Sequence, residues 1–540
     1  MPDYEKSVII FNGDTMKHEE IRARWQVGNL AAKVLEHRNL NEEQIDDLLN
    51  GDAFVHDNDA KCIQKAVERL HLAKNRNEKI LIAGDYDCDG ICATAIMKDT
   101  FDRFGIESGF YIPNRFKEGY GLNENTVKLA YEKGYSLIVT VDNGVTADKA
   151  IDLCRSLNMD ILVTDHHTIQ SELNWNLLVH PDLMGKQFQG LCGAGVALQI
   201  SRALLGEIKE HVILAAIATI GDMMDVFYEN RSLIKTGLIY LNERSFLPVE
   251  RLCERPLSFW TEKEIAFQIV PKLNAIGRLA DMVNANNVVR YLLAKDRSTI
   301  ETGASQIKEI NQQRRKLSKS MSDLALGIME DDNFICVVHD EFHEGLLGLI
   351  ANTISTSLHK PSVIFTRTET LYKGSVRSAG GLNLFDFFSD FEDTIEQFGG
   401  HAQAAGIQVL PEKMEEFKAK LHQKASTLQL SEEKEQLWIH STDCSVENIE
   451  ELERLRPYGH GFEAPVFMVD QLNIIGAQAM KNQYPKWNLS HPTCALEAIS
   501  FSLSKESIEK QIVAFEGTLS INQFMSTKRA QILVNGFIEK

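Results

Sequence analysis

Hydrophobic and polar positions alternate in blocks between about residues 78 and 230. Ile80–Ala83, Ser136–Val141 and Asp160–Thr164 are short, nearly continuous apolar runs, which is the pattern of strands buried in a parallel sheet. Residues 146–157, between the last two runs, have apolar positions at helical spacing. This alternation of strands and helices predicts an α/β fold built on a doubly wound parallel sheet.

The pattern changes on both sides of this region. Residues before about 75 have apolar positions at helical spacing, and Asn41 with Gln44 has the form of a capping box. A second alternating region begins with Phe334–Val338, and short strand-like runs recur from about residue 466. We therefore expect a helical lead-in over 1–75, the doubly wound domain over 76–295, a connector helix over 296–332, a second α/β domain over 333–430, and a charged linker at 431–435 that opens a small β-barrel region over 431–540.

Three aspartates follow the first predicted strand at alternate positions. Asp85, Asp87 and Asp89 would lie at the carboxyl end of that strand, where ligands bind in open α/β sheets. Three carboxylates on one turn repel one another unless a cation neutralises them, and hard cations such as Mg²⁺ or Mn²⁺ prefer oxygen ligands. An EF-hand loop is excluded because its twelfth position, which requires Glu, is Ile96. A solvated acidic turn stays the alternative for this stretch taken alone.

Further acids and histidines end the later apolar segments. Asp142 follows the second predicted strand, and Asp165, His166 and His167 follow the third. An apolar segment over residues 215–220 leads in the same way to Asp222. A lone histidine pair is more often a surface or core feature than a metal ligand. Several acids at strand ends together with a histidine pair, within one α/β unit, favour a metal site.

Three other stretches have residue types that bind phosphate. Gly374–Ser378 combines hydroxyls, backbone N–H groups and the Arg377 guanidinium, which suits a phosphate cradle. Arg115, in the loop after a strand at Phe110–Ile112, would lie at the same sheet edge as the acids and could hold a phosphate bidentately. Gly399–His401 predicts a flexible turn into a helix, whose N-terminus would attract anions.

Two stretches have plainer explanations. Gly190–Gly195 precedes an apolar helix, but its glycines do not fit the dinucleotide-binding spacing and indicate a tight turn from strand to helix. The basic run from Arg314 to Lys319 in the connector helix is either a solvated face or a contact with DNA. Both alternatives for this run stay open at the level of the sequence.

Composition narrows the class of protein further. The formal net charge of 57 − 76 = −19 argues against indiscriminate coating of nucleic acid but leaves room for a local basic groove. Nine cysteines without a Cys-x-x-Cys pair suit reduced thiols and no structural zinc. No apolar run reaches the roughly 18 residues of a membrane span, and residues 1–6 have no signal pattern. We expect a cytoplasmic protein with no membrane contact.

In these motifs the chain resembles the DHH phosphoesterases, and among them the RecJ family of exonucleases. The resemblance extends over roughly residues 20–538. Its superfamily motifs are Asp85–Gly90, Asp142–Gly144, Asp165–His167 and Asp222. Those specific to RecJ are Tyr111–Arg115, Glu118–Gly121, Leu273–Leu279, Gly374–Ser378, Gly399–Gly406 and Arg456–Pro465. Longer RecJ proteins carry a further C-terminal domain that this chain is expected to lack.

The resemblance implies a metal-dependent exonuclease that degrades single-stranded DNA 5′→3′ to mononucleotides in DNA repair or recombination. It makes 76–295 the DHH catalytic domain, 333–430 the DHH-associated domain and the C-terminal barrel an OB-fold. The implied cofactors are two Mn²⁺ or Mg²⁺ ions about 4 Å apart. The implied metal ligands are Asp85, Asp87, Asp142, His166 and Asp222, with Asp142 as the bridge, His167 on the scissile phosphate, and Asp89 and Asp165 orienting ligands. The implied substrate contacts are Arg115, Tyr120, Arg278, Ser375, Arg377 and His401.

The expected partner is single-stranded DNA with a 5′ end, presented with a single-strand-binding protein or a helicase to a monomeric enzyme. Two rival classes are considered. A DHH enzyme for short RNA oligonucleotides or cyclic dinucleotides is disfavoured by the OB-like end of the chain and by the motif at Arg278. A non-catalytic scaffold descended from the nuclease is disfavoured because every expected ligand is present.

Overall fold

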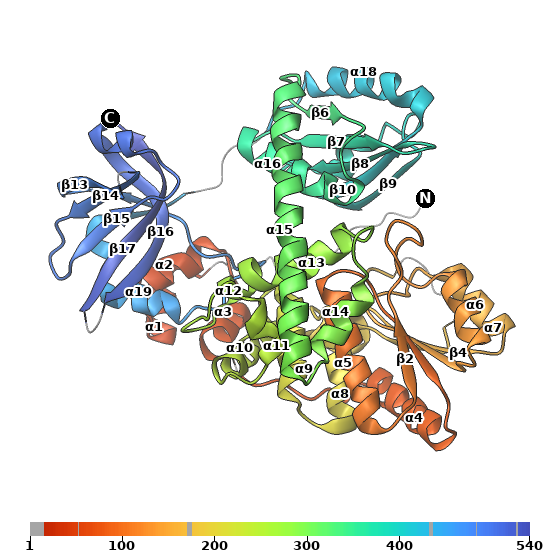
Figure 1. Cartoon of the computed structure of the whole chain (residues 1–540). Coiled ribbons are helices and arrows are strands. Elements are labelled where there is room, and N and C mark those ends of the chain that lie inside the picture. Colours follow the sequence, from red (N-terminus) through yellow and green to blue (C-terminus); the bar gives the residue numbers. More distant parts are fainter. Residues whose placement is uncertain (1–15, 52, 170–174, 431–435, 482, 525–526) are drawn as a thin grey trace.

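A computed structural model describes residues 16–51, 53–169, 175–430, 436–481, 483–524 and 527–540. The linker expected at 431–435 lies outside these residues. The described residues form three sheets, and the long helix α15 (Arg297–Ile328) runs between the first two (Figure 1). The expected connector is therefore confirmed as one continuous helix. No helix in the described part of the chain is both long and apolar enough to cross a membrane.

The first sheet is parallel throughout and has the strand order β2-β1-β3-β4-β5. Its strands are β1 (Ile80–Ala83), β2 (Ser108–Tyr111), β3 (Leu137–Thr140), β4 (Asp160–Thr164) and β5 (Leu177–Val179). Separate apolar clusters cover its two faces, so the sheet is doubly wound as expected. One cluster includes α4 (Lys61–Asn75), α5 (Cys88–Phe104), α8 (Gly193–Leu205) and α9 (Lys209–Gly221), and the other includes α6 (Glu124–Glu132) and α7 (Asp148–Ser156).

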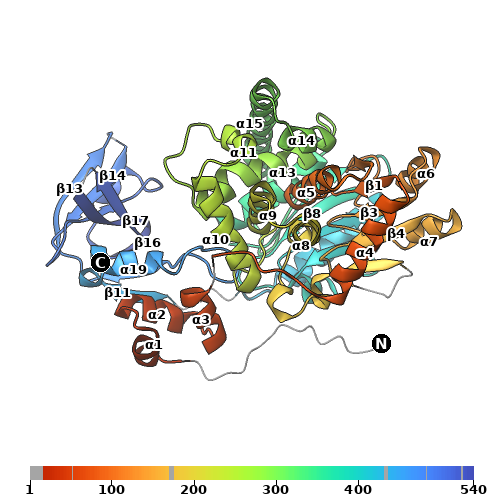
Figure 2. The same ribbon diagram turned by 90° about the horizontal axis from the view of Figure 1, so that it is seen from below.

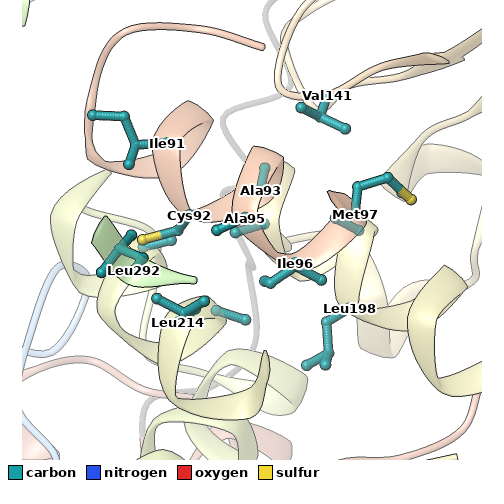
Figure 3. Packing of buried hydrophobic residues seen from close by; sticks show 14 of the residues in the cluster. Ile91, Cys92, Ala93, Ala95, Ile96, Met97, Val141, Leu198, Leu214 and Leu292 are labelled. Carbon is teal, nitrogen blue, oxygen red and sulfur yellow. The ribbon is translucent and has the colours of Figure 1, made fainter. Parts of the chain in front are cut away.

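Helix α5 is the centre of the larger cluster. Ile91, Ala95 and Ile96 on α5 are fully buried, and Leu198 of α8 and Leu214 of α9 lie against them (Figure 3). The helix is buried along most of its length because it has sheet on one side and helices on the other. This packing holds fixed the turn that carries the first three aspartates.

The apolar segment that leads to Asp222 is a helix, α9, and not a further strand. All residues from His211 to Thr219 are buried. A helix enclosed on every side is apolar all round, so its hydrophobic pattern does not differ from that of a buried strand. Asp225, three residues further on, pairs with His460 at 2.7 Å and takes no part in the acidic site.

Five further helices complete the first domain and lead to the second. They are α10 (Tyr228–Asn242), α11 (Leu247–Leu252), α12 (Glu262–Glu264), α13 (Val270–Arg278) and α14 (Ala285–Leu292). The second sheet has the order β6-β7-β8-β10-β9 and is covered by α16 (Leu347–Leu358) and α18 (Met414–Ala425). Its strands are β6 (Ile335–Val338), β7 (Ser362–Arg367), β8 (Tyr372–Arg377), β9 (Gln397–His401) and β10 (Ala404–Val409).

The turn into a helix expected after Gly399–His401 is wrong, because β9 and β10 form an antiparallel hairpin. Residues 404–409 alternate between partly exposed and buried positions, apart from one exposed glycine, which is a strand pattern. Gly400 has φ 146°, and a Cβ there would lie 2.5 Å from the carbonyl oxygen of Ala404. The glycines therefore allow a close approach of two strands rather than a helix start.

The C-terminal sheet has the order β11-β12-β16-β17-β15-β14-β13. Its strands are β11 (Leu437–His440), β12 (Phe467–Asp470), β13 (Ile474–Met480), β14 (Tyr484–Leu489), β15 (Leu496–Ile499), β16 (Ile512–Phe524) and β17 (Thr527–Glu539). In the described residues the sheet does not close into the expected barrel, since β11 and β13 stay at its edges. The short runs expected here include one long strand, β16, which has irregularities at Ile512/Ala514 and Glu516/Gly517.

The N-terminal helices pack on the C-terminal region. Helices α1 (His18–Trp25), α2 (Asn29–His37) and α3 (Glu42–Asn50) share one apolar cluster with α19 (Val446–Glu453) and the C-terminal strands (Figure 2). The expected capping box is confirmed, since Asn41 and Gln44 exchange hydrogen bonds of 2.9 and 3.1 Å. Arg231 of α10 is fully buried and donates to the carbonyls of Leu48, Leu455, Arg456 and Pro457, so it joins α3 and the segment after α19 to the first domain.

Candidate metal centre

The first acidic turn is held by the start of α5. Asp87 is the N-cap of this helix, and its Oδ1 accepts a hydrogen bond from the Gly90 N–H at 3.0 Å. Asp85 is buried between the end of β1 and the cap. A Cβ on Gly90 would lie 2.5 Å from the carbonyl oxygen of Asp85, so the turn is tight enough to require glycine. The sequence thus brings two carboxylates to the sheet edge through one strand end and one helix cap.

Asp142 reaches the same edge through an unusual backbone conformation. Its φ is 62°, in the left-handed region, which costs a non-glycine residue about 1 kcal/mol or more. Its N–H donates to the Thr164 carbonyl at 3.1 Å, and its own carbonyl accepts from the Tyr120 hydroxyl at 3.0 Å. Asn143 fixes the loop by donating to Ala83 and Val141 carbonyls. These bonds hold the Asp142 carboxylate towards the first acidic turn.

His166 brings the remaining acids together. Its Nε2 lies 3.1 Å from Asp142 Oδ1, 3.5 Å from Asp222 Oδ2 and 3.6 Å from Asp89 Oδ2. The structure therefore brings all five predicted metal ligands together. Three sets of residues could each hold a metal ion, because within each set the ligand atoms lie within 4.8 Å of one another. The sets are Asp85, Asp87 and Asp142; Asp89, His166 and Asp222; and Asp142, His166 and His167.

The electrostatics of these groups fit divalent cations. Burial, together with the charges of neighbouring carboxylates, raises the pKa of Asp85 and of Asp142 well above its usual range. Burial and the charges of Asp89 and Asp87 raise the pKa of Asp222 to about 8. The buried atoms Asp85 Oδ1, Asp142 Oδ1 and His166 Nε2 have no hydrogen-bond partner among the described residues. Buried oxygens and nitrogens without partners, in an excess of negative charge, suit bound dications.

Asp89 and Asp165 have their oxygens occupied by the protein. Asp89 accepts from the N–H groups of Gly193 at 2.6 Å and Ala194 at 2.7 Å, at the start of α8. Asp165 accepts from the N–H groups of Val145 and of both histidines that follow it. Both carboxylates are thus placed to orient loops around the site.

His167 and Tyr120 lie at the rim of the site. His167 Nδ1 is 2.8 Å from Asp165 Oδ1, and the Tyr120 hydroxyl is 3.3 Å from the ring nitrogens of His167. Burial lowers the pKa of His167, but the hydrogen bond and charge of Asp165 outweigh this effect and raise it to about 9. The side chain of His167 is 45% exposed, so its free edge can meet a ligand.

A cavity of about 270 Å³ opens in front of the acids. Asp85, Asp87 and Asp222 line one part of it, and the predicted substrate contacts Arg115, Tyr120 and Arg278 line another. Arg115 lies over the Tyr86 ring, 5.2 Å from its centre. The cavity therefore joins an anionic floor to a cationic wall.

Ser375 and Arg377 approach from the second domain. Arg377 Nη1 donates to Ser375 Oγ at 3.0 Å, and a Cβ on Gly348 would lie 2.7 Å from Arg377 Nη2. Gly348 is in the first turn of α16, so the start of this helix lies beside Arg377 and Ser375. His401 is exposed at the end of β9 and is not among the described residues that line the cavity.

Sequence reasoning missed two positioning residues. Asn274 Oδ1 accepts from the Cys88 N–H at 2.8 Å and lines the cavity, and it lies inside the 273–279 motif that gave the signal for Arg278. Gly193 lies against Asp142, and a Cβ on Gly193 would be 2.5 Å from Asp142 Cβ. No local pattern distinguishes this glycine, because its neighbour is 51 residues away in the chain.

The described fold and site agree with comparisons to known proteins. The DHH family N-terminal domain matches residues 79–221 and the DHHA1 domain matches 331–427. The acids and histidines at the edge of the first sheet, together with these two domains, define a DHH phosphoesterase. The RecJ OB domain matches residues 437–536.

The similarity to named proteins is more specific. The chain is 31% identical to a single-stranded-DNA-specific exonuclease RecJ of Bacillus subtilis, over 89% of this chain and 65% of that protein. It is 29% identical to the RecJ of Haemophilus influenzae, over 92% of this chain and 93% of that protein. The crystal structure of Thermus thermophilus RecJ with Mn²⁺ superposes with a TM-score of 0.82 at 24% identity, covering 97% of this chain and 78% of that one. The chain belongs to the RecJ family.

Proposed function

We propose that the chain is a metal-dependent exonuclease that hydrolyses single-stranded DNA from its 5′ end to mononucleotides. The observation that carries the proposal is the cavity in which Asp85, Asp87 and Asp222 face Arg115 and Arg278. In two-metal hydrolysis of a phosphodiester, dications stabilise the attacking and leaving oxygens, and cationic side chains bind the phosphates along the strand. The named activity of the B. subtilis and H. influenzae relatives, both single-stranded-DNA-specific exonucleases, supports the same function.

We assign the metal ions to Asp85, Asp87, Asp142, His166 and Asp222. When bound, two Mn²⁺ or Mg²⁺ ions would supply an activated water and stabilise the leaving oxygen. Asp142 and His166 each belong to two of the ligand groups, and of the two only the Asp142 carboxylate has two oxygens to offer, so Asp142 would be the residue that helps to hold both ions. Asp89 accepts hydrogen bonds from backbone N–H groups of α8, and Asp165 accepts one from the N–H of His166. These bonds hold α8 and the histidine loop in place around the metal ligands.

His167 has a separate part in the proposal. Its Nδ1 faces Asp165, which leaves Nε2 to donate a hydrogen bond to the scissile phosphate. Tyr120 limits the position of the ring from the other side, since its hydroxyl is tied to the Asp142 carbonyl. The pair therefore fixes the phosphate relative to the metal ligands.

The 5′ end is held where the two α/β domains meet. Arg278, Ser375 and Arg377 bind its phosphate, with the first turn of α16 beside them. Arg115 and Tyr120 contact the strand, and His401 contacts it from the second domain. A grip on the terminal phosphate next to the metal ligands explains both the polarity and the release of mononucleotides.

The test is digestion of a single-stranded oligonucleotide labelled at one end and then at the other. With Mn²⁺ or Mg²⁺, the 5′ label is released first as a mononucleotide, blunt duplex resists, and EDTA stops the reaction. Asp142→Asn replaces a charged ligand and abolishes turnover, whereas Asp225→Asn, three residues after Asp222 but paired with His460 outside the site, keeps it. Release from the 3′ label first, or turnover in the Asp142 variant, contradicts the proposal. Activity confined to di- to pentanucleotides assigns the chain to an oligonucleotide-scavenging role.

We also propose that the enzyme acts as a monomer. Its substrate strands would be exposed by a helicase or covered by a single-strand-binding protein. Light scattering during gel filtration measures the molar mass, which is 60.9 kDa for one chain. A stable mass twice this value contradicts the monomer.

A further inference from the structure

Four arginine side chains gather beside the metal centre without acidic partners. Arg115 follows β2, Arg278 ends α13, Arg314 is in the middle of α15, and Arg377 ends β8. None of the four forms an ion pair with a carboxylate in the described part of the chain, although acidic residues outnumber basic ones by 76 to 57. Converging guanidiniums repel one another unless an anion binds between them. Arg314 is the one member for which the sequence left both a solvated face and a contact with DNA open.

The position of Arg314 on its helix directs it towards the interface of the two α/β domains. Ile310 and Leu317, four residues before and three after, occupy the same helix face. Both pack in the apolar cluster that contains Leu279 and Leu347. Arg314 therefore lies on the face that contacts α13 and α16, and not on the solvent face.

The two elements that this face contacts carry the other arginines. Leu279 directly follows Arg278 at the end of α13. The segment before α16 lies against this point, because a Cβ on Gly345 would be 2.0 Å from the Arg278 carbonyl oxygen. One turn further, Gly348 lies beside Arg377. The helix face of Arg314 is thus next to both Arg278 and Arg377.

The donors of Arg314 are only partly used. Its Nη2 donates to Asn311 Oδ1 at 2.6 Å, which holds the side chain along the helix. Its Nε is buried and has no partner among the described residues. Burial and the charges of Arg115, Arg314 and Arg377 lower the pKa of Arg278 to about 10, in agreement with a cluster of like charges. Arg315, one position along the helix, is exposed and serves as a comparison.

We propose that Arg314 completes the site for the 5′-terminal phosphate and makes the enzyme select a 5′-phosphate over a 5′-hydroxyl end. The inference rests on the proposed function and deepens it. A terminal phosphomonoester carries about −1.5 to −2 charges at pH 7, whereas an internal phosphodiester carries one. A fourth guanidinium therefore strengthens the binding of the terminal phosphomonoester more than the binding of an internal phosphodiester. Arg314 is a specificity residue that reaches the end of the strand from the helix joining the two domains.

The experiment compares wild type, Arg314→Gln, Arg314→Lys and Arg315→Gln on matched strands with a 5′-phosphate or a 5′-hydroxyl. In Arg314→Gln, kcat/KM for the phosphorylated strand falls about 10- to 100-fold, as expected for one charge-assisted contact, and the value for the hydroxyl strand changes less than about threefold. Arg314→Lys recovers part of the preference, because it keeps the charge but loses the planar fork. Arg315→Gln leaves both values unchanged. An equal loss on both strands, or no loss, overturns the proposal.

A second measurement separates this inference from the proposed function. Binding of a 5′-phosphorylated trinucleotide and of its 5′-hydroxyl analogue, measured in EDTA by fluorescence anisotropy, reports the preference without turnover. A wild type that degrades neither strand refutes the exonuclease, while a phosphate preference that survives Arg314→Gln in the binding assay refutes the role of Arg314.

Discussion

Replacing Gly193 by alanine tests whether the metal centre depends on the close contact between α8 and the Asp142 loop. The new Cβ would lie 2.5 Å from Asp142 Cβ, 2.8 Å from its Cα and 2.8 Å from its Oδ1. Carbon atoms in van der Waals contact are about 3.5–4.0 Å apart, so the two segments must separate by roughly 1 Å. The atoms in conflict include backbone, which cannot turn aside as the end of a flexible side chain can.

The expected cost has two parts. Overpacking of a buried contact of this kind lowers the free energy of unfolding by about 1–3 kcal/mol. A displacement of roughly 1 Å at catalytic groups reduces turnover by about 100-fold. Because Gly193 also donates to Asp89, the shift disturbs Asp89 as well as the ligand Asp142, and Mn²⁺ affinity falls about tenfold or more.

Gly195→Ala is the matched control, two residues along the same helix. A Cβ there would meet the Leu191 side chain at 2.9 Å and none of the acids. Both variants are assayed by thermal unfolding, by calorimetric titration with Mn²⁺ and by release of nucleotides from a labelled strand. Both are expected to lose some stability, but only Gly193→Ala loses metal affinity and turnover. Wild-type Mn²⁺ affinity in Gly193→Ala would refute the reasoning.

Three further outcomes are expected. Asp89→Asn removes the charge that accepts two N–H groups at the start of α8, so urea unfolding at fixed Mn²⁺ should show a loss of about 1.5–3 kcal/mol; a value within 0.5 kcal/mol of wild type would contradict this. Arg231→Met leaves four carbonyls without their donor and should lower the free energy of unfolding by about 3–5 kcal/mol, with hydrogen exchange rising in the N-terminal helices first. Mn²⁺ at 100 times its Kd should stabilise the folded protein by about 2.7 kcal/mol in denaturant titrations, and Asp142→Asn should remove that gain.

Local patterns predicted the parts of the site that short segments build. A buried strand followed by an acid is recognisable within ten residues, and Asp85, Asp142 and Asp165 were placed at one sheet edge for that reason. The sequence did not show that a helix carries Asp222 to the site. Helix α9 is enclosed on all sides, so it has no polar face from which the helical spacing of its apolar residues could be recognised. The acid reaches the site from a helix end, where a strand end was the expected route.

Contacts between distant segments account for what the sequence could not show. The hairpin at Gly400 depends on a strand partner rather than on its own propensity, and the open edge of the C-terminal sheet depends on how β11 and β13 are placed. Arg314 lies in a basic run that suits a solvated face equally well, and it is the packing of Ile310 and Leu317 on the same helix face, together with the buried Nε, that distinguishes it from Arg315. The residue types predicted the chemistry of the site, whereas long-range packing determines which of several neighbouring residues of one type belongs to it.

The packing of the first helices on the last sheet affects how the protein is made. Leu30, Leu35 and Leu48 share their apolar cluster with Ile449 and Ile532, so their binding surface is synthesised long after they are. At about 5–20 residues per second, translation from residue 48 to residue 534 takes roughly half a minute to a minute and a half. During that time the first domain can fold, while the leading helices expose an apolar face on the ribosome. An apolar face exposed in this way is prone to aggregation, and a chaperone or a temporary contact that covers it would protect these helices until β16 and β17 are made.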